Sequence, residues 1–183
     1  MSHRIGCSSA RGCAAIAAIV FYMVCGGCGD SSSTPTVNAA TPEAAGKYIV
    51  AVAGCNDCHT PGWMEKGEAV PEGEWLVGIP IGWRGPWGTT YGSNLRLYVR
   101  NMNEEEFVKL MRTRTTRPPM NWPAMHLMSD KDLRAVYKYI RNLPAKGQRM
   151  PAWVPPDREP TTPWISMEPI MPKPPPTGPA PGI

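Results

Sequence analysis

The sequence is poor in cysteine beyond its N-terminal stretch. Of its six cysteines, only Cys55 and Cys58 lie after residue 28, and the others are Cys7, Cys13, Cys25 and Cys28. This distribution excludes a framework of structural disulfides in the rest of the chain. The length of 183 residues allows one domain of typical size with extensions, but not two full domains.

The chain also lacks a strong net charge, since its formal charge is +4 at pH 7. Such a total gives no reason to expect nucleic acid as a partner. The charge is unevenly distributed, because residues 43–74 are mainly acidic and residues 107–149 mainly basic. We therefore expect one electropositive side. Arg112, Arg114 and Arg117 would dock an acidic partner or pair with the carboxylates of a bound cofactor, or else form a solvated edge.

No apolar run is long enough for a comfortable membrane span. The run Ala14 to Val24 follows a basic start and precedes Gly26-Gly27-Cys28, an order typical of an export signal over residues 1–28. The stretch resembles a bacterial lipoprotein leader, which predicts lipidation of Cys28. Cys25 stands where that pattern favours Leu or Val, so simple cleavage and an uncleaved anchor stay open. We expect an exported, periplasmic protein that a lipid tethers to a membrane.

Composition divides the remainder of the chain into three parts. Residues 29–41 are mostly Ser, Thr, Ala and Pro and suit a flexible linker. Residues 42–150 contain the amphipathic segments of a folded domain. Residues 151–183 are rich in proline and predict an extended tail that is largely unstructured or wraps the surface.

Cys55-Asn56-Asp57-Cys58-His59 is the attachment signature of a c-type haem. Cysteines three residues apart lie on one face of a helix, so both thiols can bond the vinyl groups along one haem edge. His59 is then left to bind the iron. The alternatives are a thioredoxin-like dithiol and part of a zinc site, although no further cysteine or well-placed histidine completes the latter.

Three helices are predicted from caps and apolar spacing. The first runs from about Pro42 to Gly54, after Thr41, with Tyr48, Val52 and Cys55 on its apolar face. The second follows Asn103 and runs to about Arg112, with Phe107, Leu110 and Met111 inward. The third follows Ser129 and ends before Pro144, with an apolar face formed by Leu133, Val136, Tyr137 and Ile140.

Residues 60–93 have no sustained helical or strand period and are predicted to be loop. A long loop in a compact domain needs something to organise it. A haem would offer an apolar surface to the tryptophans of this segment, which would otherwise form a small cluster of their own. These residues are Trp63, Trp75, Trp83 and Trp87.

The sixth position of the iron decides between electron transfer and ligand chemistry. Met120 lies in the proline-rich stretch Pro118-Pro119-Met120, where it could project towards the iron. Met125 and Met128 are more easily explained as packing. His126 would give bis-histidine ligation, and an open site is the remaining choice.

These features together resemble a class I cytochrome c. The segments 86–95, 105–107 and 118–144 are similar to the haem domains of bacterial cytochrome c subunits that serve membrane alcohol and gluconate dehydrogenases. The resemblance covers roughly residues 43–150. It implies an all-α, cytochrome c-like domain wrapped round one covalent haem c, with long loops. It also implies that Cys55 and Cys58 hold the haem, that His59 is the proximal ligand, and that Met120 aligns with the axial methionine.

The chain departs from those subunits in three places. It carries one haem motif where they usually carry three, it has Arg96-Leu97-Tyr98 where they have Thr-Pro-Asp, and Asn121 replaces a proline. Contacts near the haem are expected from Tyr91, Asn94 and Trp122, with ordinary packing as the alternative.

The resulting prediction is an electron carrier and not an enzyme, which exchanges single electrons with a dehydrogenase, an oxidase or another cytochrome. The alternative is a haem peroxidase or a ligand-sensing haem protein with a displaceable sixth ligand.

Overall fold

The computed structural model describes residues 34–172. The predicted export signal, its lipidation site Cys28 and the first part of the predicted linker lie outside the described residues, as do residues 173–183 of the tail. No helix within the described part is long and apolar enough to cross a membrane.

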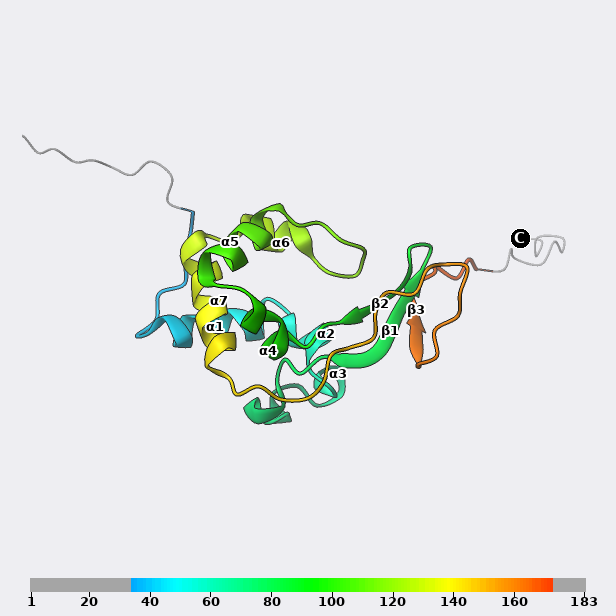
Figure 1. The fold of residues 1–183 in the computed structure, drawn as a ribbon, viewed down its shortest axis with the longest axis horizontal. Coiled ribbons are helices and arrows are strands. Elements are labelled where there is room, and N and C mark those ends of the chain that lie inside the picture. Colours follow the sequence, from blue (N-terminus) through cyan, green and yellow to red (C-terminus); the bar gives the residue numbers. More distant parts are fainter. Residues whose placement is uncertain (1–33, 173–183) are drawn as a thin grey trace, which may run out of the picture. The chain divides into compact units, whose positions relative to one another are not determined.

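Helices α1 (Pro42–Val52) and α7 (Asp130–Asn142) pack against each other (Figure 1). Both begin at the predicted caps, because Thr41 Oγ1 accepts from the Ala44 amide and Ser129 Oγ accepts from the Asp132 amide. The predicted inward face of α7 is confirmed, since Leu133, Val136, Tyr137 and Ile140 are all buried.

The predicted inward face of α1 is wrong. Tyr48 and Val52 are 56% and 61% exposed, and the buried residues of the helix are Ala45, Gly46, Ile49 and Val50. The cause is a close approach to α7 at Gly46, where an added Cβ would lie 2.0 Å from the Ala135 carbonyl oxygen. That approach turns the glycine face of α1 towards α7 and leaves Tyr48 outside.

Helix α5 (Glu104–Thr113) also begins as predicted. Asn103 Oδ1 accepts from the Glu106 amide, and the Glu106 carboxylate accepts from the Asn103 amide, which together form a capping box. Phe107 and Met111 are buried in the core that α5 shares with α1 and α7, and Leu110 packs partly buried against it. The short helix α6 (Trp122–Leu127) follows.

The all-α expectation is wrong, because the described residues also contain a three-stranded sheet with the order β2-β1-β3. The segment predicted to be loop contains two of its strands, β1 (Ile79–Gly85) and β2 (Gly88–Gly92). The other short elements are α2 (Cys55–His59), α3 (Trp63–Lys66), η1 (Gly67–Ala69), η2 (Glu72–Glu74), α4 (Leu95–Tyr98) and η3 (Val99–Asn101). The fold is therefore mixed helix and sheet.

Strands β1 and β2 form an antiparallel hairpin whose turn is Pro86-Trp87, since Gly85 pairs with Gly88. The register is irregular between Ile79 and Gly82. A Cβ on Gly82 would lie 2.3 Å from Cγ2 of Thr89, so the strands pack too closely there for a larger residue.

The described part of the proline-rich tail wraps around this hairpin. Val154 forms an isolated bridge to Thr89 of β2, and β3 (Trp164–Ser166) then pairs in parallel with residues 82–84 of β1. The Arg84 guanidinium holds the intervening segment by donating to the carbonyl oxygens of Pro156 and Arg158, at 3.0 and 2.9 Å. Surface wrapping was one of the predicted forms of the tail, but a strand within it was not predicted.

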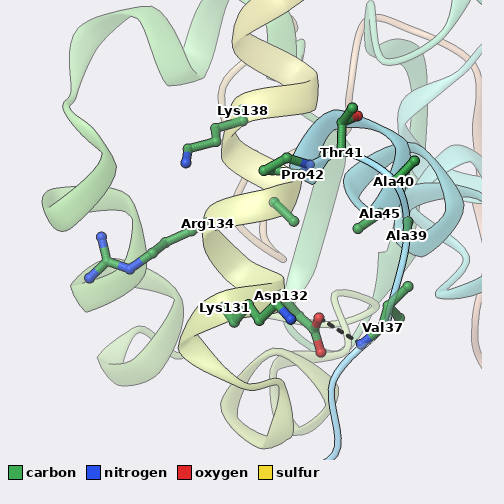
Figure 2. A pocket seen from close by; sticks show the side chains of 11 residues that line it. Val37, Ala39, Ala40, Thr41, Pro42, Ala45, Lys131, Asp132, Arg134 and Lys138 are labelled. Atoms are coloured by element: carbon green, nitrogen blue, oxygen red, sulfur yellow. Dashed lines mark hydrogen bonds between the residues drawn. The ribbon is translucent and has the colours of Figure 1, made fainter.

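The described end of the predicted linker, residues 34–41, has no helix or strand. It nevertheless contacts α7, because the Val37 amide donates to Asp132 Oδ1 at 3.0 Å (Figure 2). Val37 also packs against the core.

Candidate functional site

The Cys-x-x-Cys-His motif forms its own short helix, α2, directly after α1. Gly54 lies between them with φ +72, in the left-handed region that glycine adopts without strain, and so redirects the chain. Cys55 and Cys58 are both free thiols, each partly buried. Cys55 also packs against the hydrophobic core. One helix therefore presents both predicted attachment points.

Burial raises the pKa of both thiols, and the neighbouring Asp57 carboxylate raises it further. The pKa of Cys55 rises to about 11, so this thiol is protonated at neutral pH. Thioredoxin-like dithiols depend on a lowered thiol pKa, because the thiolate is the reactive form. The surroundings of Cys55 and Cys58 thus do not favour the dithiol alternative.

His59 is 8% exposed, and its Nδ1 lies 2.7 Å from the carbonyl oxygen of Ser93. A carbonyl can only accept, so Nδ1 carries the proton and Nε2 keeps its lone pair. Burial lowers the pKa of His59, and the hydrogen bond to Ser93 opposes this shift only in part. The net lowering favours the neutral imidazole. A neutral ring fixed through one nitrogen is the form in which histidine binds a metal through the other.

Helix α2 lies directly against the end of β2. A Cβ on Gly92 would lie 1.5 Å from the carbonyl oxygen of Cys58, so the two backbones are in contact. The Gly78 amide also donates to the His59 carbonyl oxygen at 2.8 Å. The hairpin that sequence reasoning missed is therefore the element that positions His59.

Asn56, inside the motif, is fully buried and was not singled out from the sequence. Its Oδ1 accepts from Thr60 Oγ1 at 2.7 Å, and Thr60 Oγ1 accepts from the Leu76 amide at 2.8 Å. Leu76 has φ +62, a strained conformation for a leucine, and is fully buried. Asn56 thus fixes α2 to a constrained turn. Its Nδ2 has no partner among the described residues.

Met120 lies in the loop between α5 and α6, partly buried and packed against the same core as Cys55. The loop is joined to the hairpin, because Thr90 Oγ1 donates to the carbonyl oxygen of Pro118 at 2.6 Å. The Trp122 amide donates to the Met120 carbonyl oxygen at 3.0 Å. Strand β2 thus contacts both the loop of Met120 and, through its end, the helix of His59.

The other candidates for the sixth ligand have structural roles. His126 Nε2 lies 2.9 Å from the Arg114 carbonyl oxygen, so this nitrogen carries a proton and donates. Met125 is 8% exposed within the core, and Met128 packs partly buried against it.

The three residues expected near a haem also have protein partners. Asn94 caps α4 and donates through Nδ2 to the carbonyl oxygens of Lys146 and Gln148. Trp122 is buried and donates to Thr116 Oγ1 at 2.9 Å, and Tyr91 shares a hydrogen bond with Thr162. Asn94 thus links α4 to residues 146 and 148.

Of the four tryptophans in residues 60–93, two contact each other and two lie in the hairpin. Trp63 packs edge-on against Trp75, with ring centroids 5.1 Å apart, and Trp75 is part of the core. Trp83 is buried on β1, whereas the indole nitrogen of Trp87 is buried without a partner among the described residues. Trp63 and Trp75 therefore contact each other directly.

The positive charge of the basic segment, residues 107–149, is partly neutralised by ion pairs. Arg134 pairs with Glu104 and Glu105, Lys146 pairs with Glu74, and Arg112 pairs with Asp130. Arg114 and Arg117 instead lie over the rings of Trp122 and Trp153, at 5.9 and 3.7 Å. The predicted electropositive side is therefore weaker than its residue count indicates.

A surface pocket of about 450 Å³ lies between α7 and the segment that precedes α1 (Figure 2). It is lined by residues 37, 39–42 and 45 and by one alanine and four polar or charged residues of α7, and by none of the predicted site residues. Arg134 and Lys138 at its edge both contact Glu104, so the pocket does not present an unpaired cationic cluster.

Within residues 34–172, no group of three or more His, Cys, Asp or Glu side chains is placed to hold a metal ion. A structural zinc site needs such a group. Covalent haem attachment makes a different demand, namely two thiols on one helix face and a nearby histidine with an available nitrogen. Cys55, Cys58 and His59 fit that demand.

In comparisons with known proteins, no protein-family model, no curated protein and no solved structure matches this chain.

Proposed function

We propose that this chain is an exported mono-haem c-type cytochrome that transfers single electrons between redox proteins. The observation that carries the proposal is the state of His59, which is buried, bonded through Nδ1 to Ser93 and neutral, with Nε2 available. Histidines that bind metals in proteins are oriented in this way by a partner of the other nitrogen. The two thiols of the same short helix support the assignment to c-type haem.

Each residue has a distinct part in this proposal. Cys55 and Cys58 would form the covalent attachment, and His59 and Met120 would be the two protein ligands of the iron. When bound, the haem supplies an iron that alternates between two oxidation states, and methionine with histidine favours a high potential. Cys55 and Met120 both pack against the hydrophobic core, and the backbone carbonyl of Ser93, directly after β2, fixes the histidine.

An electron carrier needs redox partners, which we propose to be a dehydrogenase, an oxidase or another cytochrome. The region around Met120 suits brief encounters, because residues 113–118 are exposed.

The periplasmic location and the lipid on Cys28 rest on the sequence of the N-terminal stretch. Replacing Cys28 by Ser should release the protein from membranes, whereas Cys13→Ser in the same stretch should not. Unchanged fractionation of the Cys28 variant would argue against lipidation.

The test of the cofactor is the mass of the protein made in a host that attaches haem c. We expect the polypeptide plus one haem, retained under denaturing conditions. Cys55→Ser and Cys58→Ser should each reduce the attached haem, and Cys13→Ser serves as the control. An unmodified mass in the unsubstituted protein would overturn the proposal, and bound zinc would favour the metal-site alternative.

The test of the sixth ligand is spectroscopic. Methionine-ligated ferric haem has a weak far-red absorption band, which Met120→Ala should abolish. Met64→Ala is a matched control, because Met64 is 72% exposed. If the band survives in the Met120 variant, Met120 is not the ligand. Rapid peroxide turnover by the unsubstituted protein would favour the peroxidase alternative.

A further inference from the structure

The loop that carries Met120 receives only part of its support from the helices it connects. Residues 114–118 of the loop are exposed, and the indole nitrogen of Trp122, the first residue of α6, donates to Thr116 Oγ1. Two further contacts come from a different part of the fold. Thr90 of β2 donates to the Pro118 carbonyl oxygen, and the Arg117 guanidinium lies 3.7 Å from the ring centroid of Trp153.

Trp153 belongs to the tail and is firmly placed. Its Nε1 donates to the carbonyl oxygen of Trp87 at 2.9 Å, in the turn of the hairpin. The next residue, Val154, exchanges two backbone hydrogen bonds with Thr89, at 2.7 and 3.0 Å. Gly88 has φ +93, and a Cβ there would lie 2.2 Å from the Val154 carbonyl oxygen, so the tail lies directly on the turn. The contacts that fix the Trp153 ring are therefore independent of Arg117.

We propose that Arg117 and Trp153 form a latch that holds the Met120 loop against the hairpin and so restricts competing ligands at the iron. This inference rests on the proposed function, because it takes Met120 as the sixth ligand. Arg117 and Trp153 are positioning residues, since they act through the loop. Figure 1 shows the loop between α5 and α6 extending towards the hairpin that the tail wraps.

The latch has a measurable consequence for ligand competition. An added ligand such as imidazole binds only when methionine has left, so its apparent affinity is proportional to the open fraction of the loop. Losing an exposed cation–π contact should raise that fraction about two- to fivefold. We therefore expect Trp153→Ala to bind imidazole about two- to fivefold more tightly than the unsubstituted protein.

The experiment is an imidazole titration of the ferric full-length protein, followed by loss of the far-red band. Trp164→Ala is the matched control, because Trp164 is also a tail tryptophan and is 43% exposed, compared with 40% for Trp153. Arg117→Ala should resemble Trp153→Ala, and it serves as the second variant if Trp153→Ala does not fold. The double variant should bind no more tightly than the stronger single one, since both residues act through one contact.

Amide hydrogen exchange gives a readout that is independent of ligand binding. Residues 113–121 should exchange faster in Trp153→Ala and Arg117→Ala than in Trp164→Ala, whereas α7 should exchange alike in all three. Equal imidazole affinity and equal exchange in Arg117→Ala and Trp164→Ala would overturn the latch while the haem and its far-red band remain. Absence of covalent haem in the unsubstituted protein would instead overturn the proposed function.

Discussion

Gly92 at the end of β2 lies against the backbone of Cys58 in α2, where a Cβ on Gly92 would be 1.5 Å from the Cys58 carbonyl oxygen. The next residue, Ser93, provides the carbonyl oxygen that holds His59. The position of His59 therefore depends on the absence of a side chain at Gly92, the residue before Ser93.

Gly92→Ala should separate β2 from α2 and break the bond between His59 and Ser93. The backbone must move to admit the methyl group, so we expect a loss of about 1–3 kcal/mol in unfolding free energy and less haem per polypeptide. Urea unfolding and haem content measure these effects. Gly73→Ala is the control, because a Cβ on Gly73 meets nothing within 4 Å. Equal behaviour of the two variants would contradict the prediction.

Gly46→Ala should destabilise the packing of α1 on α7. An alanine Cβ would lie 2.0 Å from the Ala135 carbonyl oxygen and 2.8 Å from the Tyr139 Cβ, so the helices must separate. Alanine favours helix intrinsically by up to about 1 kcal/mol, so a net loss of stability would identify the steric cost as the larger effect. Thermal unfolding measures the sign, and a raised melting temperature would contradict the prediction.

Arg96→Lys should destabilise the protein although it conserves charge. Arg96 is 1% exposed, and its guanidinium donates to the carbonyl oxygens of Trp75, Glu72 and Pro144, at 2.7, 2.8 and 3.3 Å. A lysine cannot reproduce this planar arrangement. Each buried carbonyl left unpaired costs about 1–3 kcal/mol.

Arg100→Lys is the matched control for Arg96, because Arg100 is exposed and donates one bond, to the Leu143 carbonyl oxygen. Chemical unfolding of both variants compares the two sites. A loss of stability in Arg100→Lys equal to that in Arg96→Lys would argue against a special role of the buried guanidinium.

The Glu72 carboxylate should contribute stability that depends on pH. The hydrogen bond from Lys47 lowers the pKa of Glu72, burial opposes this effect, and the hydrogen bond from the Tyr139 hydroxyl lowers the pKa further, so that the net shift is downward. Because the folded pKa lies below the unfolded one, the contribution is complete above the unfolded pKa and is lost as the pH falls through the folded pKa. It should stay below about 1 kcal/mol, since the Glu72 side chain is 40% exposed.

The measurement is the difference in unfolding free energy between the unsubstituted protein and Glu72→Gln. It should be constant above about pH 5 and shrink below about pH 4. The exposed Glu68, replaced by Gln, is the control. A difference that grows on acidification would have the wrong sign.

The helices were predictable because their signals are local. Asn103 and Ser129 cap α5 and α7 through residues three positions away, and the apolar spacing of α7 matches its buried face. The inward face of α1 was mispredicted, because it is set by contact with Ala135, which is distant in the sequence. The motif of α2 identified Cys55, Cys58 and His59, but not the carbonyl of Ser93 that orients the histidine.

The hairpin was missed because glycine, which is unfavourable in strands, occupies both ends of β2 and both the interior and the last position of β1. Its strands are completed by residues of the tail, far along the chain, and no local pattern reports such pairing. A usable signal was present in Gly85-Pro86-Trp87-Gly88, a turn-like sequence followed by two threonines and a tyrosine. Arg96 was noted only as a departure from a family pattern, although it joins three segments of the domain.

The tail that wraps the hairpin has one more consequence. Val154 covers part of the outer edge of β2, and β3 covers the outer edge of β1. Without these residues both strands would present unpaired amides and carbonyls, which readily pair with strands of other molecules. The proline-rich segment therefore occupies backbone positions on both edges of the hairpin at which strands of other molecules would otherwise pair.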